Sequence, residues 1–250
     1  MNLNDFLNPF YNNLIMSFLK AEWRKLAMAN YAIDKDILKK YIPAKTELDL
    51  WNDTCYVSLI GFMFLNTKML GVKIPFHINF EEVNLRFYVK YKDGAQWKRG
   101  VVFIKEIVPK HAITFVANTL YKEHYDTMPM SHKWSETDVS RIFEYDWRCK
   151  NQEQSFKVTT EKDLVAILEG SEAEFITEHY WGYSRKNDHK TVEYEVTHPK
   201  WEQYIVKNFD IDVDFGLVYG SDFAFLNDLS PKSVFLAEGS GITIESKRVI

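Results

Sequence analysis

The sequence predicts a mainly β protein (a β-rich α+β fold) that forms one domain over residues 1–250. Aromatic residues make up 16% of the chain, and their side chains favour strands. Turn-forming residues recur at intervals of about ten residues, which is typical of sandwiches and barrels. No repeat, low-complexity tract or Pro/Gly/Ser-rich linker divides the chain, so we expect a single core with a few short helices.

The first half of the chain begins with two predicted helices. Apolar residues recur at helical spacing within residues 4–20, which predicts a short helix packed on the core. Asp34 is placed to cap a second helix over residues 35–41, which must end near Pro43.

Two hairpins follow these helices. Residues 46–50 and 55–65 are extended segments on either side of an Asn-Asp turn, and they predict the first hairpin. Residues 83–91 alternate apolar and polar side chains, and a Lys-Asp-Gly turn leads into residues 97–108. This second hairpin is the clearest pattern in the sequence.

A short strand over residues 112–116 is predicted next, and then the strand pattern stops. Residues 117–134 mix polar, aromatic and methionine side chains more densely than any other segment. Functional residues often lie on irregular segments that a rigid sheet holds in place. We therefore expect part of the functional site here.

The second half of the chain is again rich in extended segments. Thr160-x-x-Asp163 resembles a capping box, and with Gly170 beyond it this predicts a helix over residues 164–168. The remaining predicted strands cover residues 139–149, 154–158, 173–184, 190–196, 201–213, 233–237 and 242–249.

Composition excludes several classes of function. The chain has 31 basic and 35 acidic residues, and this balance argues against a nucleic-acid binder with a basic face. No apolar run approaches the roughly 18 residues that span a bilayer, and no basic leader opens the chain. We expect a soluble, cytoplasmic protein whose partner is a small molecule, not a membrane. The sequence leaves open whether the chain forms a homo-oligomer.

The sequence also lacks the usual motifs that bind metals or cofactors. Cys55 and Cys149 stand alone, with no C-x-x-C spacing, and no two histidines lie four residues apart. The sequence contains no phosphate-binding loop, dinucleotide fingerprint or G-x-S-x-G motif. We therefore expect no metal and no cofactor.

Arg86 is the first candidate for a binding residue. It lies on a strand with an apolar opposite face, and Glu82 and Glu106 are within a hairpin's reach. One interpretation is an ion pair that fixes strand register. The other is a guanidinium that points into a cavity and binds a carboxylate.

Lys105 and the aromatic-rich run 179–183 each allow a structural and a functional interpretation. Lys105 interrupts an apolar strand, either as a paired lysine near the strand end or as an amine nucleophile desolvated in a cavity. The run His-Tyr-Trp-Gly-Tyr at 179–183 either packs in the core or lines a cavity with aromatic walls.

Several segments resemble a known family. The pattern in residues 29–48 (Ala-Asn-Tyr-x-Ile-Asp, then Ile-Pro) resembles the opening of the acetoacetate decarboxylase-like superfamily. Residues 80–89, 100–103 and 235–240 more closely resemble the uncharacterised family called domain of unknown function 2071. The resemblance spans nearly the whole chain and implies a closed, conical β-barrel with an enclosed cavity.

The resemblance also bears on mechanism. Acetoacetate decarboxylase forms a Schiff base between its ketone substrate and one of two adjacent lysines. At the matching place this chain has Tyr125 and Asp126, neither of which is an amine. The decarboxylase's active-site arginine has a counterpart in Arg24, whereas its glutamate falls at Met69. The resemblance thus implies the family's cavity without its imine chemistry.

We therefore predict a barrel whose cavity binds a small anionic or carbonyl-bearing organic molecule. Arg24 and Arg86 would bind its negative charge or carbonyl oxygen. The predicted ligand-binding residues are Arg24, Arg86, Glu106, Tyr121, Glu123, His124 and Tyr125.

Two alternatives belong to other classes of function. The chain could be an enzyme, a lyase or isomerase acting on a keto acid-like substrate, with His124 or Glu123 as acid–base and Tyr125 as proton donor. It could instead be a non-catalytic interaction protein with a cavity filled by aromatic side chains.

Overall fold

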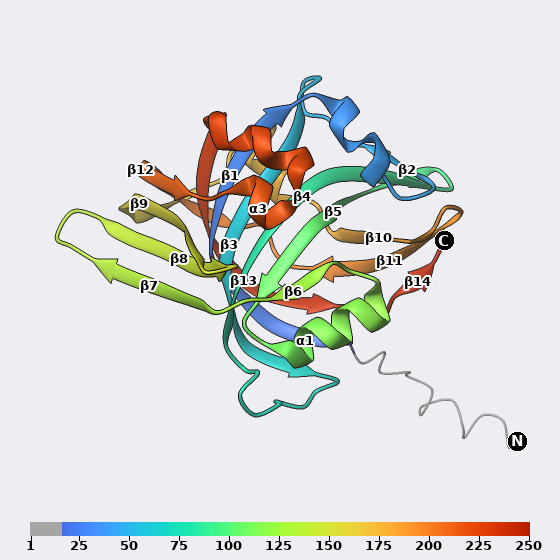
Figure 1. Ribbon diagram of the computed structural model, residues 1–250, viewed down its shortest axis with the longest axis horizontal. Helices are drawn as coiled ribbons and strands as arrows, with labels where there is room; N and C mark the ends of the chain where they lie inside the picture. The colour runs from blue at the N-terminus through green and yellow to red at the C-terminus, as the bar shows by residue number, and fades with distance from the viewer. Residues whose placement is uncertain (1–16) are drawn as a thin grey trace, which may run out of the picture.

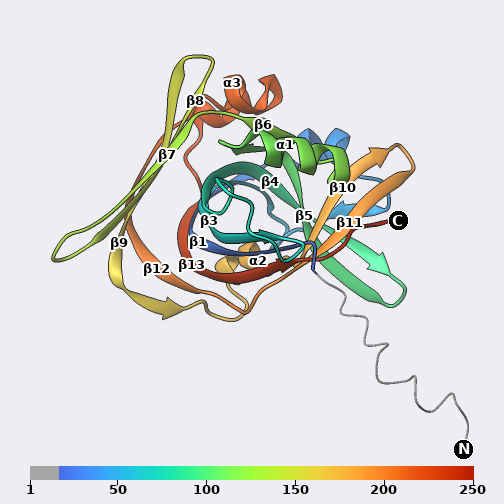
Figure 2. The same cartoon turned by 90° about the horizontal axis from the view of Figure 1, so that it is seen from below.

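A closed ring of strands is the central feature of the fold. The computed structural model describes residues 17–250. In the described chain the ring consists of β1 (Leu19–Ile33), β3 (Cys55–Met69), β4 (Phe80–Asp93), β5 (Gln96–Val108), β10 (Trp181–Asn187), β11 (Lys190–Thr197) and β13 (Ser233–Ile244). β11 pairs with both β10 and β13, and this second pairing closes the ring. The prediction of a mainly β fold with a few short helices is confirmed (Figures 1 and 2).

A second wall of strands continues from β13 and covers the outside of the ring. Its order is β12 (Glu202–Asp212), β9 (Gln152–Ala166), β8 (Arg141–Cys149) and β7 (Met130–Glu136). Figure 2 shows this wall beside the ring. Buried apolar side chains from both pack together between them. Because β1, β3 and β4 are covered on both faces, their sequences are apolar over long runs and not strictly alternating.

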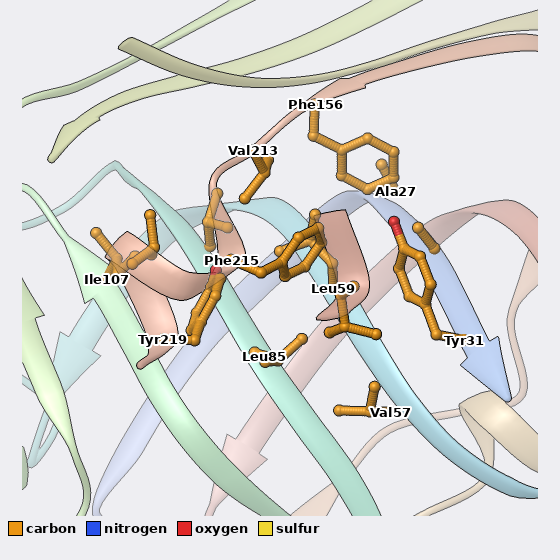
Figure 3. Packing of buried hydrophobic residues seen from close by; sticks show 14 of the residues in the cluster. Ala27, Tyr31, Val57, Leu59, Leu85, Ile107, Phe156, Val213, Phe215 and Tyr219 are labelled. Atoms are coloured by element: carbon orange, nitrogen blue, oxygen red, sulfur yellow. The ribbon is translucent and has the colours of Figure 1, made fainter. Parts of the chain in front are cut away.

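The outer core lies between the ring and this second wall. Phe156 of β9 and Phe215 pack against side chains from the outer face of the ring, such as Leu59 and Leu85 (Figure 3). Tyr31 of β1 meets Phe215 edge-on, with ring centroids 5.5 Å apart. This core holds the ring in shape and is separate from its interior.

Short helices and strands complete the described chain. Asp34 caps η2 as predicted, since the Asp36 backbone N–H donates to its carboxylate at 2.9 Å. Figure 2 shows α2 within the outline of the ring, and its Phe175 packs on Tyr88 of β4. These elements are η2 (Lys35–Tyr41), β2 (Thr46–Leu48), α1 (His111–Val116), η3 (Ala117–Tyr121), β6 (Tyr125–Thr127), α2 (Glu172–Thr177), α3 (Phe215–Tyr219), η4 (Ser221–Asp228) and β14 (Arg248–Val249).

Three predicted elements are wrong in type. Residues 112–116 form helix α1, not a strand. Residues 164–168 are not a helix, because β9 runs through them to Ala166 and pairs with β12. The segment 173–184 divides into helix α2, capped by Ser171, and strand β10. In each case a neighbouring strand or helix outweighs the local preference of the sequence.

Of the two predicted hairpins, one forms and the other does not. β4 and β5 form the predicted hairpin, with Gly94 in the left-handed conformation at its turn. The first hairpin is wrong, because β2 pairs with β4 and not with β3. The two final strands are one strand, β13, that passes through Gly239. Of the helix predicted in residues 4–20, residues 4–16 lie outside the described part, and β1 begins at Leu19.

The described helices are all short. None in residues 17–250 is long and apolar enough to cross a membrane.

Candidate functional site

Three polar side chains line the inside of the ring on β4. Successive residues of a strand point to opposite faces, so Glu82, Asn84 and Arg86 share one face. Val83 and Leu85 between them belong to the outer core. The polar residues are nonetheless buried, with at most 9% of any of them exposed. A sheet face with three buried polar residues in alternation is a departure from ordinary packing that needs an explanation.

A β-bulge decides which side chains of β5 face inward. Leu85 lies opposite Lys105, whereas its neighbour Arg86 lies opposite Phe103, so one extra residue is inserted into β5. Phe103 and Glu106 therefore both line the ring interior, although they are three residues apart. Lys105 lies on the other face, where its ammonium is 2.8 Å from the carboxylate of Asp126.

Two tyrosine–glutamate pairs join this cluster from other elements. The Tyr125 hydroxyl donates to Glu82 at 3.1 Å, and Tyr125 is held beside Glu106 by the parallel pairing of β5 and β6. The Tyr194 hydroxyl, from β11, donates to Glu123 at 2.9 Å. Residues far apart in sequence thus form one polar layer across the ring.

The three glutamates hold protons near neutral pH. Burial raises the pKa of Glu82 to about 7 and that of Glu123 to about 8. Burial, together with the negative charges of Glu123 and Glu82, raises the pKa of Glu106 well above its usual value. Close to pH 7, Glu82 and Glu123 can therefore donate hydrogen bonds as acids or accept protons as bases, whereas Glu106 favours its protonated form.

Two chambers lie on either side of this polar layer. The outer chamber has a volume of about 140 Å³, and its wall is mostly apolar, with Phe18, Met69 and Ile113 among its residues. The inner chamber is smaller, about 50 Å³, and more polar. Both chambers are lined by Phe64, Glu82, Tyr125, Tyr194 and Ile244, which form the partition between them.

The inner chamber is lined by polar atoms that have no hydrogen-bonding partner in the described protein. A buried polar atom without a partner costs roughly 1–3 kcal/mol, so a group of them in one place marks a candidate binding site. The unpartnered atoms of residues lining the inner chamber are Trp23 Nε1, Asn84 Oδ1, Arg86 Nε, Glu106 Oε2 and His179 Nδ1.

Arg86 is the cation of this chamber. One of its terminal nitrogens donates to the carbonyl oxygen of Ile176 at 3.3 Å, and the guanidinium lies over the ring of Tyr88. No carboxylate in residues 17–250 lies within 4.0 Å of it. The guanidinium is thus buried without a counter-ion.

The other predicted binding residues are divided between three places. Tyr121, Glu123 and Tyr125 line the outer chamber, together with Glu82. Arg24 lines neither chamber, because its guanidinium is 2.7 Å from the carboxylate of Glu22 and also pairs with Glu238. His124 is exposed and borders a separate hollow on the other face of β5.

Sequence reasoning missed three residues of the site. Asn84 lies in the same alternating stripe as Arg86, and that stripe was a signal that could have identified it. Tyr194 and His179 reach the site only through the tertiary fold, although the run 179–183 was considered as a cavity wall. Among residues 17–250, no cluster of three or more His, Cys, Asp or Glu side chains is arranged to hold a metal ion.

Comparisons with known proteins show which proteins this chain resembles in sequence and in fold. A short match, 33% identical over 86 residues, links the chain to the uncharacterized protein YqjF of Bacillus subtilis. That match spans about a third of the chain and about a third of YqjF.

Solved structures share the fold at low sequence identity. Acetoacetate decarboxylase of Legionella pneumophila is 11% identical, with a TM-score of 0.63, 93% of this chain and 86% of that chain covered. An acetoacetate decarboxylase-like enzyme of Sphingomonas wittichii has 10% identity and a TM-score of 0.65, covering 94% and 93%. The enduracididine biosynthesis enzyme MppR, complexed with pyruvate, has 11% identity and a TM-score of 0.67, covering 97% and 94%.

Family membership rests on the sequence itself. Residues 20–241 match the family DUF2071, described as an uncharacterized conserved protein, and this range includes all the ring strands except the first residue of β1 and the last residues of β13. The chain therefore belongs to the DUF2071 family and has an acetoacetate decarboxylase-like fold.

Proposed function

We propose that the protein binds a small organic molecule with a carbonyl or carboxylate group in the two chambers of the ring. The observation that carries this proposal is the buried Arg86, which has no counter-ion within 4.0 Å in the described chain and an unpartnered Nε–H at the inner chamber. Ile176 accepts from only one terminal nitrogen of Arg86, and a guanidinium removed from water remains costly while its other N–H groups lack an acceptor. A bound carboxylate would supply that acceptor in a planar, bidentate geometry.

The surrounding glutamates support an oxygen-rich ligand. Since burial favours their protonated forms, Glu82, Glu106 and Glu123 need not repel a carboxylate near neutral pH. As neutral acids they would donate hydrogen bonds to its oxygens. The apolar outer chamber would hold a hydrocarbon or aromatic body beyond this polar group.

This binding would proceed without imine formation. No lysine lines either chamber, and Lys105 is paired with Asp126 outside the ring. The fold does accommodate an oxo acid in another protein, because MppR has been solved in complex with pyruvate. At 11% identity that complex illustrates the fold's capacity and not this chain's ligand.

The test is ligand-dependent thermal stability. Wild-type protein is heated with a panel of 2-oxo acids and branched or aromatic carboxylic acids. A ligand at a hundredfold excess over its Kd stabilises by about 2.7 kcal/mol, which raises Tm by roughly 5–10 °C. Arg86→Met should abolish this shift, whereas Arg148→Met, at an exposed arginine on β8, should retain it. A shift that survives in Arg86→Met would refute the proposal.

Acid–base catalysis is a second candidate, favoured by the pKa of Glu123 near 8 and its contact with Tyr194. Ionised Glu123 would take a proton from the carbon beside a carbonyl, and the electron pair would move onto the carbonyl oxygen. A neutral neighbouring carboxyl group would stabilise that enolate by donating a hydrogen bond. His124 has no part in this scheme, since it lies outside both chambers.

This second candidate predicts exchange of carbon-bound hydrogen. In D₂O, proton NMR of 4-methyl-2-oxopentanoate should show loss of the signal beside the carbonyl only in the presence of protein. Glu123→Gln should slow that exchange by roughly 100-fold or more. Equal exchange with both proteins would show that Glu123 is not the base, and no exchange with wild-type protein would restrict the chain to binding.

A further inference from the structure

His179 lines the inner chamber and is buried. Its side chain is 1% exposed. It packs between the rings of Phe175 and Tyr88, at centroid distances of 5.0 Å and 4.7 Å. Arg86 lies over the ring of Tyr88 as well, and both Arg86 and His179 line the inner chamber.

Asp49 determines which nitrogen of His179 carries the proton. His179 Nε2 is 3.2 Å from Asp49 Oδ2, which also accepts from Arg99 Nε at 2.6 Å. Although burial opposes ionisation, hydrogen bonds from His179 and Arg99 keep the pKa of Asp49 below its usual value. An ionised Asp49 accepts only, so Nε2 must be the donor and Nδ1 keeps its lone pair.

The imidazole remains neutral in this position. Burial lowers the pKa of His179 to about 4, and the nearby charges of Arg99 and Arg86 act in the same direction. Nδ1 has no hydrogen-bonding partner in the described protein. Two unpaired atoms thus belong to residues that line the inner chamber: an acceptor, His179 Nδ1, and a donor, Arg86 Nε.

We infer that Asp49 and His179 form a subsite for a hydroxyl group next to the carboxylate that Arg86 binds, so that the cavity selects a hydroxy acid. This inference rests on the proposed function and names its ligand class. The carboxylate would accept from Arg86 Nε, and the hydroxyl would donate to His179 Nδ1. Nδ1 needs a hydrogen-bond donor from the ligand. A 2-oxo acid would place another acceptor against it, and an acid with no group at carbon 2 would place no polar group there.

Three acids with the same carbon skeleton separate these possibilities. Isothermal titration measures the Kd of 2-hydroxy-4-methylpentanoate, 4-methyl-2-oxopentanoate and 4-methylpentanoate with wild-type protein. One added hydrogen bond to a buried acceptor predicts that the hydroxy acid binds roughly fivefold to tenfold more tightly than the other two. The branched tail is common to all three, so the outer chamber contributes equally.

His179→Gln is the diagnostic variant. Glutamine can still donate to Asp49 but offers no ring nitrogen to the ligand, so the preference for the hydroxy acid should disappear while the Kd of 4-methylpentanoate stays within about twofold. His189→Gln, the same substitution at an exposed turn between β10 and β11, should leave the preference unchanged.

A second measurement uses the unmutated protein, in case His179→Gln does not fold. In ¹⁵N NMR, the Nδ1 resonance of His179 should move when the hydroxy acid is added and stay in place with 4-methylpentanoate. If all three acids bind equally and Nδ1 does not respond, the inference is wrong while the proposed function stands. If none of the acids binds, both are overturned.

Discussion

Glu82, Glu106 and Glu123 are buried carboxyl groups with no basic side chain within 4.0 Å in residues 17–250. An isolated carboxylate in such a place is far less stable than the neutral acid, because burial removes the water that solvates the charge. The side chains therefore favour protonation, and Glu106 Oε2 and Glu123 Oε2 have no hydrogen-bonding partner in the described protein. At the scale of single residues, the protonation state of each carboxyl group decides whether it can donate a hydrogen bond or only accept one.

Stability should fall as pH rises through the neutral range. In the folded protein the pKa of Glu123 is about 8, whereas an unfolded glutamate titrates near 4.5. The folded state binds this proton more tightly than the unfolded state. The stabilisation that results is fully present below about pH 4.5 and is lost as pH rises to 8. At pH 8 the Glu123→Gln variant should thus have an unfolding free energy at least about 1 kcal/mol above that of wild type, measured by urea unfolding. At pH 4.5 the two unfolding free energies should differ little.

The exposed Glu169 provides the control for that experiment. Glu169→Gln should follow the wild-type pH dependence throughout, since its carboxylate is in water in both states. A Glu123→Gln profile parallel to that of wild type would contradict the burial argument.

No lysine imine should form with acetoacetate. A free lysine has a pKa of about 10.4, and the chambers contain carboxyl groups that would raise an amine's pKa further if ionised. Borohydride reduction in the presence of acetoacetate, followed by intact mass spectrometry, should therefore show no adduct. A reduced adduct on Lys105 or Lys122 that needs the ketone would show that an amine reaches the substrate.

At the scale of elements, close packing between β10 and β11 positions the site. Gly182 of β10 lies directly against the ring of Tyr194, so that a Cβ at position 182 would overlap it. Tyr194 in turn donates to Glu123 and forms part of the partition between the chambers. The absence of one side chain on β10 thus allows a tyrosine from β11 to reach the polar layer.

Gly182→Ala should test this packing. The added methyl group must displace Tyr194 or the strand, at a cost of roughly 1–3 kcal/mol in unfolding free energy, and should disturb the Tyr194–Glu123 contact. Gly241→Ala is a matched change on β13, where the nearest atom to a new Cβ is 4.0 Å away, and it should cost less than about 0.5 kcal/mol. Urea unfolding of both variants decides the matter, and equal costs would contradict the steric argument.

At the scale of the whole molecule, two cores have different tasks. The ring interior contains the chambers, and the outer core between ring and second wall contains packed apolar side chains (Figure 3). A ring closed by the β11–β13 pairing has few unpaired edges there, which favours a rigid cavity wall. Stability and ligand selection should therefore respond to different mutations.

Phe156→Ala should separate the two cores. Phe156 is fully buried in the outer core and lines neither chamber, so the variant should lose roughly 3–5 kcal/mol of unfolding free energy. Its Kd for any acid that binds wild-type protein should stay within about twofold at a temperature where it remains folded. A large change in Kd would show that the cores are coupled.

The sequence by itself determined the mainly β fold and the β4–β5 hairpin, because alternation and turn residues act over a few neighbouring positions. It also pointed to Arg86, Glu106, Glu123 and Tyr125, whose polar groups interrupt apolar strands or follow them directly. The structure places all four around the two chambers. These residues are close in sequence, or lie on strands joined by one turn.

Only the tertiary structure decided the rest. The bulge in β5 turns Glu106 inward and Lys105 outward, a change of phase that a period of two does not reveal. Residues 164–166 form part of strand β9 because β12 is available as a partner. His179, just before β10, and Tyr194 on β11 join Arg86 and Glu123 because β10 pairs with β5 and β11 pairs with β10, although these strands lie far from β4 in the sequence. Such long-range pairing depends on the energy of the whole sheet, and local sequence carries no record of it.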